Sequence, residues 1–242
     1  MKNYMRHLRN RTGKLHYSAT FERIPMEKQD RILNTAIREF AEEGYAAANI
    51  NHIARKAGIS VGSLYSYFAS KEELFLVLCE LGNRLLEEVM EQMVNNLDAG
   101  QSSFEMIEKL LEVTLQYSQD NPDFCKIYLD LSTEKLNKLS SRLTKELEYN
   151  YIKFYHILLQ NGITRKEIRE DLDIQLASFF LDNIVIMLQF ATSSSYYSER
   201  LKAYFSMNRS LEQGEHRSDW NDLQSLPSRI SDYLKKSWGA KT

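Results

Sequence analysis

Apolar residues recur three or four positions apart through most of this chain, which is the spacing of one buried face of an α-helix. The pattern predicts long helices over 25–44, 71–97, 104–117, 133–160, 171–191 and 220–238, and a short one over 123–131. Pro227 lies inside the last range, where we expect a kink or an interruption. The polar, tyrosine-rich stretch 193–214 is expected to be an irregular connection. The sequence therefore predicts an all-α fold.

The stretch 49–68 carries a shorter and more specific pattern. Ile50, Ile53, Ala54 and Ala57 share one apolar helical face. Asn49 precedes this face, and its side chain can accept a backbone N–H as an N-cap. These residues predict a first short helix.

A second short helix follows a three-residue turn. Gly58 suits the left-handed position that ends a helix, and Ser60 can cap the next one. Leu64 and Phe68 lie on the buried face of that second helix. Two short helices joined by a glycine-bearing turn of this length predict a helix-turn-helix.

This region resembles the DNA-binding segment of the TetR family of transcriptional regulators. The shared pattern reads Ala54-x-x-Ala57-Gly58-Ile59-Ser60-Val61-Gly62-Ser63-Leu64-Tyr65-Ser66-Tyr67-Phe68-x-Ser70-Lys71-Glu72-x-Leu74. An upstream pattern, Arg31-Ile32-Leu33-x-x-Ala36-x-x-x-Phe40-Ala41-x-x-Gly44-Tyr45, is similar to the first helix of that family. The resemblance implies a DNA-binding domain over 21–72 and a helical effector-binding and dimerisation domain over 73–242.

The resemblance also implies that the second short helix enters the major groove of DNA. The residues implied at the DNA are Arg31, Asn49, Ser60, Val61, Gly62, Ser63, Tyr65, Ser66, Tyr67 and Lys71. From the helical period we expect Tyr65 and Tyr67 to be exposed, with packing aromatics as the alternative, and Lys71 is implied at a phosphate. Val61 cannot hydrogen-bond but can contact a thymine methyl, so we expect sequence choice to depend on A·T-rich steps and DNA shape.

The net charge of −2 does not by itself indicate a nucleic-acid partner, but its distribution does. Residues 1–24 carry six bases and one acid, net +5, residues 25–70 carry five of each, and the remainder is therefore −7. The basic charge thus gathers beside the helix-turn-helix. Residues 1–20 lack periodicity, so we expect a flexible basic arm, which either embraces DNA or is only a solvated tail.

Cys79 and Cys125 lie far apart in the sequence, which indicates buried thiols rather than a zinc site or a disulfide framework. No apolar segment follows the basic N-terminus, and polar residues interrupt the run 176–191. Neither a signal peptide nor a membrane span is therefore predicted. We expect a cytoplasmic protein without a metal ion or a cofactor.

Polar residues also interrupt the apolar faces of the second predicted domain, which indicates either an internal hydrogen-bond network or a small-molecule pocket. They are Asn150, His156, Asp182, Asn183 and Gln189. The candidate pocket residues are Tyr128, Leu147, Tyr151, Phe154, Phe179, Asp182 and Met187, with ordinary core packing as the alternative for each. A carboxylate among aromatic side chains would favour a cationic ligand.

The range 171–191 is apolar nearly all round, and such a helix must be covered on both sides. In the resembled family the last two long helices of each subunit form a four-helix dimer interface. The interface residues implied here are Phe180, Ile184, Leu188, Ile230, Tyr233 and Leu234. We therefore expect a homodimer that binds an inverted-repeat operator.

The resemblance implies a ligand-responsive DNA-binding regulator, most often a repressor that a small molecule releases from its operator. The alternative is a DNA-binding dimer without a small-molecule effector, whose second domain serves dimerisation or a protein partner. The sequence contains no Gly-rich phosphate loop, no G-x-S-x-G motif and no metal-ligand spacing, so we do not expect an enzyme.

Overall fold

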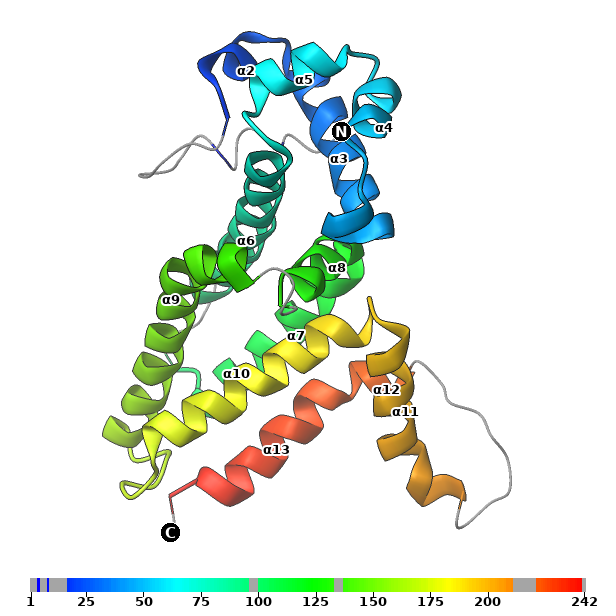
Figure 1. The fold of residues 1–242 in the computed structure, drawn as a ribbon. Helices are drawn as coiled ribbons and strands as arrows, with labels where there is room; N and C mark the ends of the chain where they lie inside the picture. Colours follow the sequence, from blue (N-terminus) through cyan, green and yellow to red (C-terminus); the bar gives the residue numbers. More distant parts are fainter. Residues whose placement is uncertain are drawn as a thin grey trace. The chain divides into compact units, whose positions relative to one another are not determined.

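The computed structural model describes residues 4, 8, 17–95, 100–132, 137–210 and 221–240, and most of these residues are helical (Figure 1). The helices are α2 (Ala19–Arg23), α3 (Met26–Ala47), α4 (Ile50–Lys56), α5 (Val61–Tyr67), α6 (Lys71–Asn95), α7 (Ser103–Asp120), α8 (Pro122–Leu131), α9 (Asn137–Thr164), α10 (Ile174–Ala191), α11 (Ser195–Ser210), α12 (Asn221–Gln224) and α13 (Leu226–Trp238). Within these ranges there is no strand, only an isolated antiparallel bridge between Ile168 and Gly239. The all-α prediction is confirmed.

The chain folds into two compact units that interleave in sequence. The first unit comprises Met1–Glu88 and Asn121–Ser141, and the second comprises Val89–Asp120 and Arg142–Thr242. The predicted domain boundary at residue 72 falls inside the first unit, because this unit continues along α6 to Glu88. It also includes α8, which packs along α3. The helix-turn-helix is thus part of a larger compact body.

The first unit is built around α3. One face of α3 is buried and consists of Ile32, Leu33, Ala36, Ile37 and Phe40. The helices α2, α4 and α5 gather at one end of α3, and α8 packs along it toward the other end (Figure 1). The apolar periodicity read from the sequence therefore identifies the core-facing side of this helix correctly.

The predicted end of the first long helix at Gly44 is confirmed as a break. Gly44 has a φ of 72°, a left-handed conformation that residues other than glycine rarely adopt, and one further turn leads to Ala47. The next backbone N–H, that of Tyr45, donates to Oδ2 of Asp130 at 2.6 Å. The helix α8 thus supplies a hydrogen-bond partner where the α3 ladder is interrupted.

The N-terminal residues that the structure describes are anchored to the first unit. Tyr4 and Leu8 are only 4% and 2% exposed. The N–H of Tyr4 donates to Oδ1 of Asp30 at 3.1 Å. The ring of Tyr4 packs edge-on against that of Phe124, with ring centres 6.1 Å apart. The prediction of a flexible arm over 1–20 is wrong at Tyr4, Leu8 and 17–20, where Tyr17 is buried and α2 begins at Ala19. Residues 1–3, 5–7 and 9–16 lie outside the described residues.

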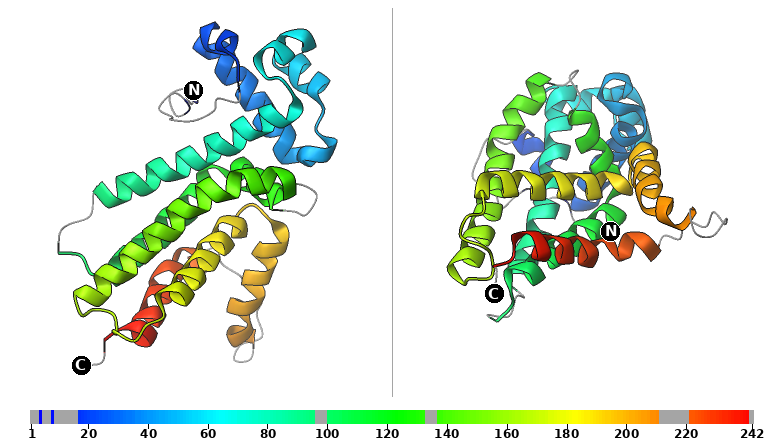
Figure 2. Two further views of the ribbon diagram at one scale, coloured as in Figure 1. Left: turned by 60° about the vertical axis from the view of Figure 1, so that its left-hand side comes forward. Right: turned by 90° about the horizontal axis from the view of Figure 1, so that it is seen from below.

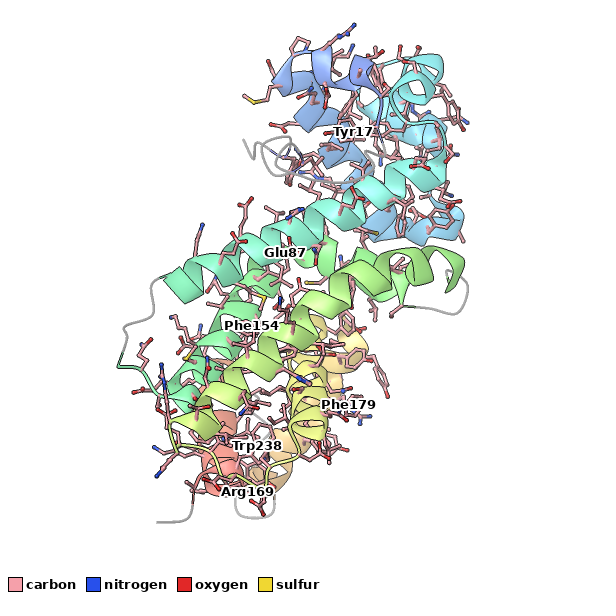
Figure 3. The ribbon with its side chains drawn as sticks, turned by 90° about the vertical axis from the view of Figure 1, so that its left-hand side faces the viewer. Tyr17, Glu87, Phe154, Arg169, Phe179 and Trp238 are labelled. Atoms are coloured by element: carbon pink, nitrogen blue, oxygen red, sulfur yellow. The ribbon has the colours of Figure 1, made fainter. Side chains whose placement is uncertain are left out.

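The second unit is built around α7. Both α10 and α13 pack against α7, and α11 packs against α10 (Figure 2). The hydroxyl of Ser231 in α13 donates to the backbone oxygen of Phe104 in α7 at 2.9 Å. At one end of this unit Arg169 and Trp238 lie together, where the N–H of Arg169 donates to the oxygen of Trp238 at 2.9 Å (Figure 3).

The sequence pattern predicts the limits of α10 and α13 well but does not predict α2 or α11. The expected interruption near Pro227 is confirmed, since α12 ends at Gln224 and Pro227 occupies the first turn of α13, where its missing N–H costs nothing. By contrast, α11 replaces the irregular connection expected over 193–214. Its segment is mostly polar, and Leu201 is the buried apolar side chain among those described in it.

Of the helices that the structure describes, α10 is the one long and apolar enough to cross a membrane by length and composition. The share of its side chains buried within the protein is 44%. A core helix of a soluble protein passes the same test, and one face of α10 packs against α7.

The buried carboxylate of Glu39 joins α3 to α4. Its Oε1 accepts the N–H of Asn49 at 3.1 Å, and its Oε2 lies 3.4 Å from Nζ of Lys56. His52 adds a third contact, with Nδ1 at 3.5 Å from Oε1. Burial raises the pKa of Glu39, but the hydrogen bonds and the nearby positive charge outweigh burial, so the pKa lies below its ordinary value.

We expect Glu39→Gln to lower the free energy of unfolding by about 1.5–3 kcal/mol at neutral pH, because hydrogen bonds to a charged group contribute about that much. The folded pKa is depressed, so the stabilisation is present above the unfolded value of about 4.3 and is lost as the pH falls through the folded value. Urea unfolding of both proteins from neutral to acid pH measures this. The two stabilities should converge in acid.

The matched control is Glu43→Gln, which changes an exposed carboxylate on the same helix. It should leave the stability at neutral pH unchanged. Equal losses in the two variants, or a Glu39→Gln deficit that is independent of pH, would contradict the role assigned to Glu39.

Candidate nucleic-acid interface

The two short helices begin with the caps that the sequence predicts. At the start of α4, Oδ1 of Asn49 accepts the N–H of Asn51 at 2.9 Å. At the start of α5, Oγ of Ser60 accepts the N–H of Ser63 at 3.0 Å. Gly58 in the turn between them has a φ of 68°, so the left-handed position expected for it is confirmed. The local geometry is that of a helix-turn-helix.

The leading edge of α5 is open to solvent. Ser60 and Gly62 are exposed, Val61 and Ser63 are half-buried, and Tyr65 is 49% exposed. A Cβ placed at Gly62 would meet only Oγ of Ser60, at 3.9 Å, so packing within the chain does not require glycine there. Arg31, Asn49 and Ser66, which the sequence also implies at the DNA, are exposed as well.

Two cationic residues implied at phosphates also make contacts within the chain. Nε of Arg31 donates to the oxygen of Ala57 at 2.9 Å and ties α3 to the turn. Nζ of Lys71 donates to the oxygens of Ala46 and Ala48, at 3.2 and 2.7 Å, and caps the end of α3. Because an ammonium has three N–H groups, a phosphate contact by Lys71 remains a prediction.

The expectation that Tyr67 is exposed is wrong. This side chain is only 6% exposed, and its ring lies 5.6 Å from that of Phe21. The reason is α2, which packs against α5 and covers the face that the helical period alone leaves open. Tyr65, two positions earlier, points away from this cover and stays exposed.

The chemistry offered by this surface is hydrogen bonding and apolar contact. The edge of α5 is formed by serine hydroxyls, one valine and one tyrosine. Arg55, in the last turn of the preceding helix α4, is also exposed. Across the described part of the chain, no group of three or more His, Cys, Asp and Glu side chains is placed to hold a metal ion. Serine hydroxyls and an arginine suit base edges and phosphates.

The candidate pocket residues do not form one group. Tyr151, Phe154 and Met187 are half-buried against the core of the second unit. Phe179 is 60% exposed on the outer side of α10 and therefore does not line the interior of the second unit (Figure 3). Tyr128 belongs to α8 in the first unit. The side chain of Leu147, like that of Asn150, lies outside the described residues.

A buried tyrosine missing from the sequence prediction contacts the one acidic pocket candidate. Tyr155 is 1% exposed and hydrogen-bonds to the carboxyl of Asp182. Burial raises the pKa of Asp182, and the hydrogen bond from Tyr155 only partly offsets this. One turn before Asp182 on α10, the hydroxyl of Ser178 is buried and has no hydrogen-bond partner among the described residues. The position of Tyr155 one turn after Tyr151, on the same helical face, is the sequence signal that could have identified it.

The predicted dimer-interface residues differ in their exposure. Phe180 and Tyr233 are 50% and 70% exposed, and Ile184 and Ile230 are half-buried. The prediction that Leu188 and Leu234 lie in the dimer interface is wrong. Both are buried in the core of their own unit, where α10 and α13 pack against α7. The exposed apolar strip of α10 instead includes Leu176 and Phe179.

Residues 32–78 match the family model described as bacterial regulatory proteins of the tetR family. The chain is also 31% identical over 143 residues to the uncharacterized HTH-type transcriptional regulator YerO of Bacillus subtilis strain 168. That match covers 57% of this chain and 49% of the relative. The chain thus spans about half the length of the first curated relatives that it matches.

Solved structures extend the likeness in fold to nearly the whole chain. A TetR family transcriptional regulator from Chloroflexus aurantiacus superposes with a TM-score of 0.65 at 22% identity, covering 93% of this chain and 99% of that one. The regulator FadR of Bacillus subtilis, solved in complex with stearoyl-CoA, gives 0.59 at 19% identity, covering 85% and 96%. Residues 32–78 therefore match the DNA-binding segment of the TetR family in sequence, and the chain as a whole shares its fold with TetR-family regulators.

Proposed function

We propose that this protein is a cytoplasmic DNA-binding transcriptional regulator, a homodimeric repressor that a small molecule releases from an inverted-repeat operator. The observation that carries the proposal is the solvent-exposed leading edge of α5 in a capped helix-turn-helix of the TetR family. The likeness to that family supports the regulatory role, and the exposed side chains support DNA as the partner.

In the proposed complex α5 is the recognition helix in the major groove. Ser60 and Ser63 offer hydroxyls to base edges, and Val61 offers a methyl contact to thymine. Tyr65 and Arg31 are the proposed phosphate contacts, and such contacts position a protein on DNA without reading its sequence. Gly62 lets the helix backbone approach the DNA closely, since no side chain stands between them.

A second copy of this chain is the proposed cover for the exposed face of α10. Leu176, Phe179 and Phe180 are each at least 50% exposed there, and Tyr233 adds an exposed ring on α13. Contiguous apolar surface of this kind favours burial in an interface. The opposite face of α10 is already buried against α7, so a partner has only this strip to cover.

The proposed effector site lies beside Asp182 and Tyr155 in the second unit. A half-buried carboxyl of raised pKa is unfavourable for stability, and such groups are often kept because a ligand uses them. The carboxyl favours a ligand with a positive charge or a hydrogen-bond donor. The structure of FadR with stearoyl-CoA supports a small-molecule effector, although the effector here need not share that chemistry.

The proposed mechanism is one of thermodynamic linkage. DNA favours the dimer whose two recognition helices match successive major grooves, about 34–36 Å apart. A ligand that prefers another arrangement weakens DNA binding by its differential affinity for the two states, and DNA weakens ligand binding by the same factor.

Capture of sheared genomic DNA by the full-length protein, followed by sequencing, tests the DNA-binding proposal. We expect an inverted repeat whose affinity falls steeply with salt, because phosphate contacts release counterions. Gly62→Ala should reduce affinity for this operator about 10-fold or more, since the added methyl separates α5 from the DNA. The same substitution should raise the free energy of unfolding by about 0.5–1 kcal/mol, as expected for alanine in a helix.

The matched control is Gly100→Ala, at another exposed glycine with no atom within 4 Å of the added Cβ. It should leave operator affinity unchanged. Unchanged affinity in Gly62→Ala would exclude close approach at that position, and the absence of any enriched DNA would overturn the proposed function.

Phe180→Glu is expected to convert the dimer to a monomer, because it places a charge in the proposed interface. Sedimentation velocity measures this. Ile157→Glu, at a side chain that is 51% exposed on α9, is the control and should remain dimeric. If the control alone dissociates, the interface lies on α9 rather than α10.

Asp182→Asn is expected to raise the melting temperature by about 2–4 °C at neutral pH, the shift that about 1 kcal/mol gives for a chain of this size. The folded pKa of Asp182 is raised, so its stabilising contribution is present below the unfolded value of about 3.9 and is lost as the pH rises through the folded value. The difference between variant and wild type should therefore vanish in acid.

A thermal-shift screen of cationic and amine-bearing small molecules extends the comparison. Compounds that stabilise the wild type should stabilise Asp182→Asn less. If no compound raises the melting temperature of either protein, the result would favour the alternative, a DNA-binding dimer without a small-molecule effector.

A further inference from the structure

We propose that the segment 17–24 is a clamp that positions the recognition helix, with Ser18 and Phe21 as its positioning residues. This inference rests on the proposed function, since it concerns how α5 is presented to DNA. The clamp lies outside the helix-turn-helix pattern that the sequence shares with its family, and the matched range begins only at residue 32.

Ser18 holds the C-terminal end of α5. Its N–H donates to the oxygen of Tyr67 at 2.8 Å, and its hydroxyl donates to the oxygen of Ser66 at 2.8 Å. These oxygens belong to the last turn of α5, whose carbonyl groups lack partners within the helix. The helix has only seven residues, a length at which isolated helices are unstable in water. Bonds from outside the helix are therefore a large part of what holds this end in place.

The same serine begins α2. Its Oγ accepts the N–H of Phe21 at 3.4 Å as the N-cap of that helix. One hydroxyl thus links the start of α2 to the end of α5. Removing this hydroxyl disturbs both helix ends at once, whereas the caps of Asn49 and Ser60 stay intact.

Phe21 provides the apolar part of the clamp. Its side chain is fully buried, and its ring centre lies 4.8 Å from Phe68 and 5.6 Å from Tyr67. The ring of Tyr17, labelled in Figure 3, packs edge-on against the ring of Phe21, with the two ring centres 5.8 Å apart. The rings fill the space behind α5, on the side opposite to its exposed leading edge.

The clamp is itself tied to α3. Nε2 of Gln29, which is fully buried, donates to the oxygen of Phe21 at 2.6 Å. The recognition helix is therefore held at its N-terminal end through the turn and at its C-terminal end through α2, and both connections lead to α3. A helix that reads base edges must be held to within about 0.5 Å and 10–20°. Loosening one end of α5 should therefore weaken sequence-specific contacts to bases more than contacts to phosphates.

Ser18→Ala in the full-length protein tests the clamp. Affinity for the captured operator should fall about 5- to 10-fold, the loss that one hydrogen bond commonly gives. Affinity for a scrambled duplex of the same length should stay within about 2-fold, because phosphate contacts remain. Amide hydrogen exchange measured by mass spectrometry should become faster in residues 61–68 and remain unchanged in α4.

Three further variants separate positioning from a general loss of folding. Thr20→Ala removes an exposed side chain from the same short helix and should change neither affinity nor exchange. Ser18→Thr retains the hydroxyl, so operator affinity and amide exchange should match those of the wild type. Phe21→Leu keeps the site apolar but removes the ring contacts, and it should resemble Ser18→Ala.

The clamp is excluded if Ser18→Ala leaves operator affinity and exchange in α5 unchanged, or if specific and non-specific affinity fall together. If the wild-type protein enriches no DNA, the proposed function fails. The hydrogen-exchange comparison then decides by itself whether residues 17–24 hold α5.

Discussion

A buried carboxylate, Glu39, is the interaction on which the helix-turn-helix depends. It is the polar link between α3 and the start of α4, and it accepts a backbone N–H while facing Lys56 and His52. A carboxylate in an apolar core is costly unless such partners are present. The placement of α4 on α3 determines where the turn at Gly58 emerges, and hence where α5 begins. Glu39 thus helps to position the exposed edge proposed to read DNA, together with the bond from Arg31 to Ala57 at the turn.

Among the described residues of the first unit, three carboxylates accept a backbone N–H from another segment. Asp30 accepts the N–H of Tyr4, Glu39 that of Asn49, and Asp130 that of Tyr45. Each pair joins segments far apart or separated by a turn, and each satisfies a backbone group at a chain entry or a helix break. Carboxylate–amide bonds are directional, so they determine the registration of helices that apolar packing alone would leave adjustable.

The second unit relies on apolar packing, and its few polar groups therefore stand out. One face of α10 packs on α7, the opposite face exposes phenylalanines, and Asp182 lies between them with Tyr155 as its partner. The three sides of one helix thus supply the core, the proposed dimer surface and the proposed effector contact. Such sharing would bring the proposed effector contacts close to the proposed subunit interface, which is where a change in dimer geometry would have to begin.

The sequence by itself determined the helical fold, the helix-turn-helix and its caps, because periodicity, Gly58, Asn49 and Ser60 act over a few neighbouring residues. It also identified the leading edge of α5. Only the tertiary structure decided which neighbour covers each helical face. It buried Tyr67 beneath α2, placed Leu188 and Leu234 in their own core, exposed Phe179, and brought Tyr155 to Asp182. A helical period shows which residues share a face, but segments distant in sequence determine whether that face meets the core, a partner or solvent.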